Sequence, residues 1–281
     1  MKEIQLILAG NGHGAHVAYK SLADLFPEIH LLSQDTELKA MLRTRDRVIS
    51  DFSESDAHYC VCAGYQKLIG KKVLGSKTII NTHPSLLPKF RGMHSVVWAM
   101  LNREKEIGFS IHLVNEYMDD GDIIAQHSIA NDGQITSKQI MNDFDCYVLE
   151  ELGNIVSKYI AGEIKPVPQD RSKATWVPRR NMDDCIIQFD MPNWQLRSLF
   201  KALVRPYPLP RLKIGERIFE ITDHDIIDLD YYTSIGRVVN VENKVAYIKT
   251  KEGILLVKGL VETATDKPVV ISEVLKIGQR L

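Results

Sequence analysis

Short apolar runs alternate with helical patterns over the first half of the chain. Strand-like runs are found at 4–9, 29–32, 59–63, 78–81, 108–114 and 123–129. Between and after them, apolar residues at helical spacing predict helices at 15–25, 37–42, 95–102 and 137–160. Strands that alternate with helices are typical of an α/β domain with a mainly parallel sheet. In such sheets ligands bind at the carboxyl ends of the strands.

The pattern changes after about residue 165. Prolines and charged residues indicate a linker, which is followed by a helix at 192–203. Short strand-like runs separated by Gly and Asn turns follow at 211–214, 218–222, 236–241, 245–250 and 254–261. Such short strands favour a small barrel. We therefore predict a first domain over 1–175, a linker over 176–190 and a second domain over 191–281.

Composition narrows the classes of protein. The chain has 281 residues, 44% of them apolar and 25% charged, which is ordinary for a globular protein with a sizeable core. Its net charge of −1 weighs against nucleic acid as the main partner. No apolar stretch approaches a membrane span, so we expect a cytoplasmic protein without a membrane partner. The four cysteines lack zinc-site spacing, and we predict no metal.

Three polar side chains with complementary chemistry follow apolar runs. Asn81 and His83 lie two apart at the end of a predicted strand, so on an extended chain they project to the same side. Asp119 comes later, in an Asp-Asp-Gly-Asp stretch. An amide can donate to an oxyanion, an imidazole can accept a proton, and a carboxylate can orient the imidazole. The pattern predicts an acyl-transfer site.

Two motifs carry a resemblance to a known family. Asn-Thr-His-Pro-Ser-Leu-Leu-Pro-Lys-Phe-Arg-Gly from residue 81, followed by Met-Asp-Asp-Gly-Asp-Ile-Ile from residue 118, resembles the folate-dependent formyltransferases. Met191-Pro192, Pro206-Tyr207-Pro208 and the closing Gly-Gln-Arg-Leu resemble the second domain of the two-domain members. The resemblance implies a Rossmann-like catalytic domain followed by an OB-like barrel.

The resemblance also implies roles for individual residues. Asn81 would hydrogen-bond the formyl oxygen of N10-formyltetrahydrofolate, the co-substrate. His83 would act as the base or as a further oxyanion stabiliser, and Asp119 would position His83. We expect the neighbouring Asp120 to be solvated. The residues implied for co-substrate binding are Tyr65, Gln66, Leu68, Ser85, Leu86, Leu87, Pro88 and Asp122.

Four residues are candidates for binding the acceptor: His13, Arg91, Arg179 and Arg180. The turn Gly10-Asn-Gly-His-Gly14 follows a strand and precedes a helix, but its third glycine comes too early for a dinucleotide fingerprint. It is either a phosphate site or a structural turn. Arg179 and Arg180 either contact a diphosphate or are solvated linker charges, and Arg91 either contacts the acceptor or has a structural role.

Three functions remain open. We favour N-formyl transfer to a nucleotide-linked (dTDP or UDP) deoxy-aminosugar for surface polysaccharide synthesis, by a homodimer. The alternative is formylation of methionyl-tRNA. Family members that act on tRNA have a long basic insertion after the second strand, whereas here the segment 33–40 is short and not basic. A third reading is a binding or regulatory protein that kept the fold and lost turnover, or a dinucleotide-dependent protein that uses the glycine turn. We expect no nucleic-acid partner.

Overall fold

The computed structural model describes residues 4–229 and 231–281, which form two compact units. The first unit contains the chain through Val96, together with Glu106–Ala130 and Gln139–Pro178. The second unit contains Val97–Lys105, Asn131–Lys138 and the chain from Arg179. The first unit thus ends near the expected boundary at 175, while two segments of the first half group with the second unit.

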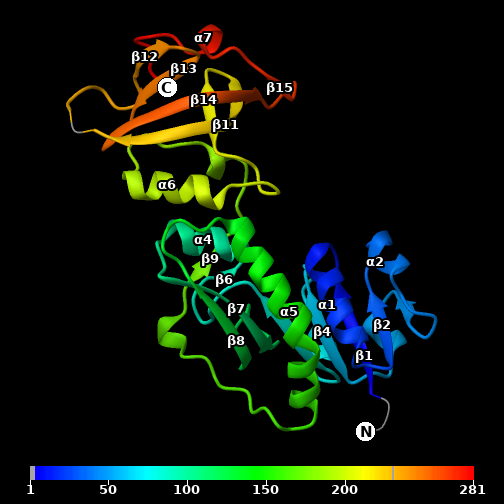
Figure 1. The fold of residues 1–281 in the computed structure, drawn as a ribbon. Helices are drawn as coiled ribbons and strands as arrows, with labels where there is room; N and C mark the ends of the chain where they lie inside the picture. The colour runs from blue at the N-terminus through cyan, green and yellow to red at the C-terminus, as the bar shows by residue number, and fades with distance from the viewer. Residues whose placement is uncertain (1–3, 230) are drawn as a thin grey trace. The chain divides into compact units, whose positions relative to one another are not determined.

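A seven-stranded sheet forms the centre of the first unit (Figure 1). Its strands are β1 (Gln5–Gly10), β2 (Glu28–Leu32), β3 (Arg47–Ile49), β4 (Tyr59–Ala63), β5 (Thr78–His83), β7 (Glu106–Leu113) and β8 (Ile123–Ala130). The helices are α1 (His13–Ala23), α2 (Thr36–Ala40), α3 (Lys71–Leu74), α4 (Ser95–Leu101) and α5 (Ser137–Ile160), and the division into units falls within both α4 and α5. A short parallel pair joins β6 (Arg91–Gly92) to β9 (Trp176–Val177).

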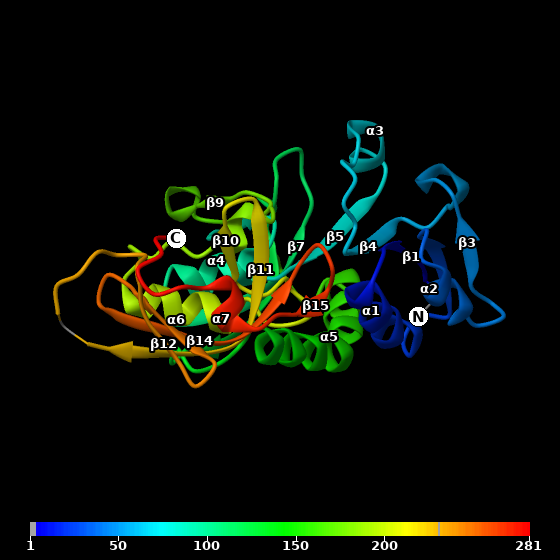
Figure 2. The ribbon, with the colours of Figure 1, turned by 90° about the horizontal axis from the view of Figure 1, so that it is seen from above.

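The strand order is β3-β2-β1-β4-β5-β7-β8, with parallel pairing from β3 to β5 and antiparallel pairing from β5 to β8. This confirms the predicted mainly parallel sheet. Helices α1 and α5 lie side by side against the sheet (Figures 1 and 2). After β1 the chain continues to β2, which pairs with one edge of β1, and later returns to β4, which pairs with the opposite edge. The carboxyl ends of β1 and β4 therefore flank the crevice in which such sheets bind ligands.

Strands β1 and β4 are almost wholly apolar because both faces of the sheet are covered there. Residues 6–9 of β1 and 60–63 of β4 are at most 2% exposed. Cys60 and Cys62 are among them, buried as small apolar residues. Burying one large aliphatic side chain stabilises the fold by about 2 kcal/mol. The apolar residues of these strands therefore make the middle of the sheet stable, and the loops at its carboxyl end are attached to a fixed support.

The second unit is an antiparallel sheet with two helices. Its strands are β10 (Arg211–Ile214), β11 (Arg217–Asp228), β12 (Val238–Glu242), β13 (Val245–Lys249), β14 (Gly253–Glu262) and β15 (Lys267–Pro268). The order is β10-β11-β14-β13-β12, and β15 pairs with β14. Helix α6 (Asn193–Ala202) buries Leu196, Leu199 and Phe200 at helical spacing, and α7 (Ile271–Val274) follows β15. The prediction of a β-rich second unit preceded by one helix is confirmed.

Among the described residues, no helix is both long enough and apolar enough to cross a membrane.

Asp46 is a buried carboxylate that joins α1 to the outer strands of the sheet. Its side chain is fully buried and accepts hydrogen bonds from the Tyr19 hydroxyl (2.5 Å), the Arg43 guanidinium (2.8 Å) and the Ile29 amide (2.9 Å). Burial alone would raise the pKa of Asp46, but these bonds outweigh burial and lower it to about 2. The charged form is therefore the stable form in the folded protein.

Replacing Asp46 by asparagine is expected to lower the free energy of unfolding at pH 7 by about 2 kcal/mol. Because the pKa is lower in the folded state, the charge stabilises the fold above about pH 4, and this stabilisation is lost as the pH falls towards about 2. Urea unfolding at pH 7 and in acid checks this: the difference from wild type should shrink in acid. Asp56→Asn, at an exposed carboxylate, is the control. Equal losses in both variants at pH 7 would contradict the expectation.

Candidate functional site

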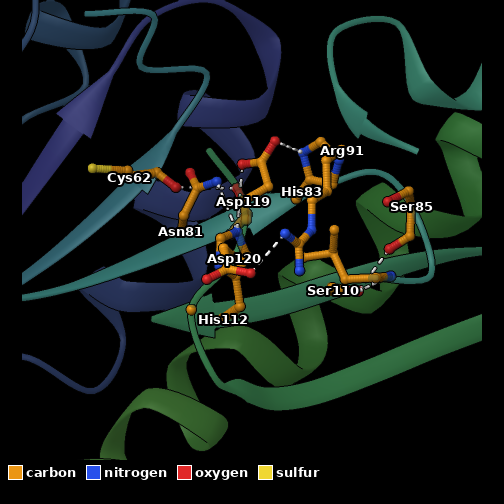
Figure 3. Close-up of polar contacts among 12 residues, drawn as sticks. Cys62, Asn81, His83, Ser85, Arg91, Ser110, His112, Asp119 and Asp120 are labelled. Atoms are coloured by element: carbon orange, nitrogen blue, oxygen red, sulfur yellow. Dashed lines mark hydrogen bonds and ion pairs between the residues drawn. The ribbon is translucent and has the colours of Figure 1, made fainter. Parts of the chain in front are cut away.

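Strands β5 and β7 bring four polar side chains to one face of the sheet. Their antiparallel register pairs Asn81 with His112 and His83 with Ser110. Cross-strand partners share a face, and so do residues two apart on one strand. Figure 3 shows Asn81, His83 and His112 gathered with Asp119, which lies in the loop between β7 and β8. We call Asn81, His83, His112 and Asp119 the polar cluster.

His83 is fixed by the hydrogen bond that one ring nitrogen makes. Its Nε2 lies 3.1 Å from the Phe90 carbonyl oxygen and 3.2 Å from the Ser95 hydroxyl. A carbonyl oxygen only accepts, so Nε2 carries the proton and Nδ1 keeps its lone pair. Nδ1 is 3.7 Å from Oδ2 of Asp119. The buried His83 can therefore take a proton at Nδ1, where the carboxylate would stabilise the resulting imidazolium.

Asp119 is held in place by its backbone and by one carboxylate oxygen. Its φ of 50° lies in the left-handed region, which Asp adopts more readily than most residues. Oδ2 accepts a hydrogen bond from the Gly92 amide (2.9 Å), and the Asp119 carbonyl accepts one from the Gln169 side chain (2.8 Å). At Gly121 a Cβ atom would lie 2.0 Å from the Leu113 carbonyl, so this close approach requires glycine.

Asp120 is buried in an ion pair, and the expectation that it is solvated was wrong. It is 6% exposed, and its carboxylate lies 2.6 Å from the Arg91 guanidinium and 2.6 Å from that of Arg171. Burial would raise the pKa of Asp120, but the hydrogen bonds from Arg171 and Arg91 hold it below its usual value. Arg91 is 3% exposed and also donates to Gln169 (2.6 Å), so its contacts support the structural alternative for this residue.

Two residues of the segment implied for the co-substrate turn their side chains into the protein. The Ser85 hydroxyl donates to the Lys89 carbonyl (2.8 Å), and Leu87 is 3% exposed. The Ser110 hydroxyl donates to the Ser85 carbonyl (2.6 Å) and accepts from the Leu87 amide (3.1 Å), which fixes the segment. Leu86, Pro88 and Asp122 are partly exposed. Any contact that Ser85 or Leu87 makes with a ligand is therefore through the main chain.

The loop after β4 is the exposed part of the predicted co-substrate site. It follows the strand beside β5, because Cys62 of β4 pairs with Asn81. Gln66 and Leu68 are exposed, and Tyr65 packs edge-on against Phe52 with ring centroids 5.9 Å apart. Within the described residues, the amides of 66–68 have no protein acceptor. The loop thus offers donors and an apolar side chain at the same sheet edge as the polar cluster.

A cavity of about 1000 Å³ lies at the carboxyl ends of β1 to β4 and shares this loop. Its lining combines polar, basic, acidic and aromatic side chains, among them Asn11, Ser33, Gln34, Lys39, Lys67, Asp51, Glu54, Phe52 and Tyr65. Ligand sites in proteins usually have about 300–1,000 Å³. The cavity is therefore large enough for a nucleotide-sized molecule.

The glycine turn after β1 is already occupied by a carboxylate. Oδ2 of Asp35 accepts from the Gly12 amide (2.9 Å) and lies 3.0 Å from Nε2 of His16. Backbone bonds from Leu38 and then from Gly12 lower the pKa of Asp35 to about 2. A phosphate placed here would meet a negative charge, which favours the structural alternative for this turn. The exposed His13 pairs with Asp145 (2.7 Å).

Arg179 and Arg180 belong to the second unit, which is described by itself. Arg179 is exposed. Arg180 donates to the Asp184 carbonyl, and its guanidinium carbon lies 5.5 Å from the centroid of the Trp98 ring. These contacts give Arg180 a local structural role, while the expectation that both arginines bind the acceptor stays a prediction.

Sequence reasoning missed His112 and Gly92. His112 stood near the motifs, but only the antiparallel register of β5 and β7 places it opposite Asn81. Gly92 was read as the end of a motif, whereas its amide holds Asp119. Among the described residues, no group of three His, Cys, Asp or Glu side chains could hold a metal ion.

Family models for formyl transferases match both parts of the chain. The family model described as formyl transferase matches residues 15–147, and the model described as formyl transferase, C-terminal domain, matches 181–278. A methionyl-tRNA formyltransferase from Clostridium novyi (strain NT) is 24% identical over 249 residues, which is 88% of this chain and 79% of that protein.

Two solved structures show the same fold. The N-formyltransferase from Helicobacter canadensis, in complex with folinic acid and dTDP-3-aminofucose, has a TM-score of 0.70 and 16% identity, over 90% of this chain and 98% of that one. A variant of HypX from Aquifex aeolicus has a TM-score of 0.67 and 14% identity, over 97% of this chain. The match covers 48% of HypX, so this chain spans about half of its length.

The first family model includes all four residues of the polar cluster, and the second includes most of the second unit. These matches, together with the fold, show that the chain belongs to the formyl transferase family of enzymes.

Proposed function

We propose that this enzyme transfers the formyl group of N10-formyltetrahydrofolate to the amine of a nucleotide-linked (dTDP or UDP) deoxy-aminosugar. The observation that carries this proposal is the connection between β2 and α2, which consists of Ser33, Gln34 and Asp35. Asn11 binds the first two, and Asp35 caps α2 through the Leu38 amide (3.0 Å). A short, tied-down connection without Lys or Arg lacks the basic side chains that dominate affinity for tRNA phosphates.

The adjacent cavity supports a small-molecule acceptor. It offers hydrogen-bonding groups and two aromatic rings, which suit a base and a sugar. Of its charged lining residues, Lys39 and Lys67 would attract a diphosphate, whereas Asp51 and Glu54 would oppose it. It also borders the loop that leads to the polar cluster. The Helicobacter canadensis enzyme, which shares the fold, was solved with a dTDP-aminosugar and a folate.

The loop after β4 suits the folate. Its free amides and the exposed Leu68 match a flat ring system that is polar at its edge and apolar on its face. The bound folate would supply a formyl group activated for transfer to an amine. The acceptor amine would bond to the formyl carbon while Asn81 donates from its amide to the formyl oxygen, His83 takes the amine proton at Nδ1, and Asp119 stabilises the imidazolium. The bond from the formyl carbon to N10 would then break, and His83 would pass the proton to N10 of the departing tetrahydrofolate.

Methionyl-tRNA remains the second candidate, because the relative from Clostridium novyi is named for that reaction. Mass spectrometry separates the two. N10-formyltetrahydrofolate is offered with dTDP- and UDP-linked 3-amino and 4-amino sugars and with charged initiator methionyl-tRNA, and each acceptor is checked for the added mass of CO. We expect a formylated sugar nucleotide and unchanged tRNA. Formylated methionyl-tRNA alone would overturn the proposal.

We further propose that the product serves surface polysaccharide synthesis and that the enzyme is a homodimer. Sedimentation equilibrium tests the dimer, and a monomer mass at assay concentration would refute it.

A further inference from the structure

His112 is a buried imidazole in the polar cluster to which the proposed reaction gives no role. It is 1% exposed and is the direct cross-strand partner of Asn81. Its Nε2 lies 3.2 Å from Nδ2 of Asn81, and Figure 3 shows these two side chains facing each other. Its Nδ1 lies 2.7 Å from the Leu113 carbonyl oxygen. Both ring nitrogens therefore have a hydrogen-bond partner.

The carbonyl contact determines which ring nitrogen carries the proton. The Leu113 carbonyl can only accept, so Nδ1 of His112 is the donor. In the neutral ring Nε2 then has a lone pair and must face a donor. Asn81 therefore turns its NH₂ group, and not its carbonyl oxygen, towards the imidazole.

The surroundings keep this imidazole neutral. Burial, together with the nearby His83 and Arg91, lowers the pKa of His112 to about 4, against the opposing effect of the Asp119 carboxylate and the Leu113 carbonyl. Oδ1 of Asp119 lies 3.7 Å from Nε2, too far for a hydrogen bond. Nε2 thus stays an acceptor at neutral pH, and Asn81 supplies its donor.

We propose that His112 is a positioning residue that fixes the orientation of the Asn81 amide by accepting one of its two N–H bonds. The inference rests on the proposed formyl transfer. If the amide turned by half a rotation, its oxygen would face the Nε2 lone pair of His112. With one N–H held by His112, the second N–H of Asn81 is set to donate to the formyl oxygen. The donor is oriented before charge develops, which is the condition for effective oxyanion stabilisation.

Two variants separate positioning from packing. His112→Leu keeps a similar volume but removes the acceptor, whereas His112→Gln retains an amide oxygen that can accept from Asn81. With Leu we expect kcat to fall about tenfold or more, because an Asn81 amide that rotates freely stabilises the transition state less well. KM for both substrates should stay within about twofold, because the same amide contributes little to binding in the ground state. With Gln we expect most of kcat to return. Equal rates in both variants would overturn the proposal.

The double variant shows whether His112 acts through Asn81. If it does, adding His112→Leu to Asn81→Ala should leave kcat unchanged, because the positioned group is already absent. A full additional loss in the double variant would mean that His112 acts independently of Asn81 and would refute the inference.

Nitrogen NMR tests the geometry without any turnover. In ¹⁵N-histidine-labelled wild-type protein at pH 7, the His112 signals are identified by their loss in His112→Gln. We expect a proton on Nδ1 only. A proton on Nε2, or on both nitrogens, would overturn the inference even in a protein that formylates its acceptor. Conversely, wild-type protein that formylates no acceptor but has the Nδ1 proton would refute the proposed function and leave the His112–Asn81 geometry supported.

Discussion

Asn81→Ala is expected to lower kcat for formyl transfer by about 10²- to 10³-fold, the loss found when one oxyanion donor is removed from an acyl-transfer site. In the proposed reaction Asn81 is the neutral donor of the polar cluster, and alanine leaves the formyl oxygen without its partner. KM should change much less than kcat, because the bond strengthens as charge develops. Steady-state kinetics with both substrates varied checks the result.

Stability must be followed in the same variant. Asn81→Ala leaves the buried Nε2 of His112 without its donor, so the free energy of unfolding in urea should fall by about 1–3 kcal/mol while the protein stays folded. Asn131→Ala is the matched control: Asn131, like Asn81, is partly buried and donates to the Glu104 carbonyl (2.8 Å), but it lies outside the polar cluster. Near-normal kcat in Asn81→Ala, or an equal loss of kcat in Asn131→Ala, would remove Asn81 from the mechanism.

The strands that hold the site were predictable because they are buried on both faces. The run at 59–63 coincides with β4, and the helix at 137–160 coincides with α5. The sequence did not indicate β3, β6 or β9. Each has two or three residues, too few for a period-two pattern, and each forms through pairing with a distant segment.

Asn81, His83 and Asp119 were recognisable because a motif names residue types along the chain. The residues that hold these side chains in place could not be recognised, because they depend on which strands pair and in what register. Strand β5 was expected to end at Asn81, yet it continues to His83 because β7 pairs with it that far. The same antiparallel pairing brings His112 to Asn81. A sequence shows that 108–114 is a strand, but not which strand it will pair with or in which direction.

Asp120 shows the same limit for charged residues. An Asp-Asp-Gly-Asp stretch is typical of an exposed turn, and local chemistry alone predicts solvation. Its burial follows from Arg91 and Arg171, which reach it from other parts of the chain. A charged side chain is buried where the fold places oppositely charged residues beside it, and the sequence around Asp120 does not show which distant residues will lie there.

Asp120→Ala is expected to lower the free energy of unfolding by about 3–5 kcal/mol, the cost of leaving a buried charge without its partner. Arg91 would lose the carboxylate 2.6 Å away while staying buried, and its Nε already has no hydrogen-bond partner in the described residues. Urea unfolding at pH 7 measures the loss. Asp170→Ala is the control, because that carboxylate is half-exposed and pairs with the exposed Lys173. Equal losses in the two variants would contradict a buried ion pair.

A double variant separates two effects of Asp120→Ala: the unpaired charge left on Arg91, and the loss of the contact between Asp120 and Arg91. Arg91→Met in the Asp120→Ala background removes the unpaired guanidinium and keeps an apolar stem, so part of the stability should return. Activity should not return with it. Arg91 precedes Gly92, whose amide holds Asp119, and the ion pair anchors both chain segments. We therefore expect kcat per folded molecule to stay about tenfold low in the double variant, since Asp119 is no longer fixed beside His83. Restored kcat together with restored stability would show that the ion pair contributes to folding and not to the geometry of the site.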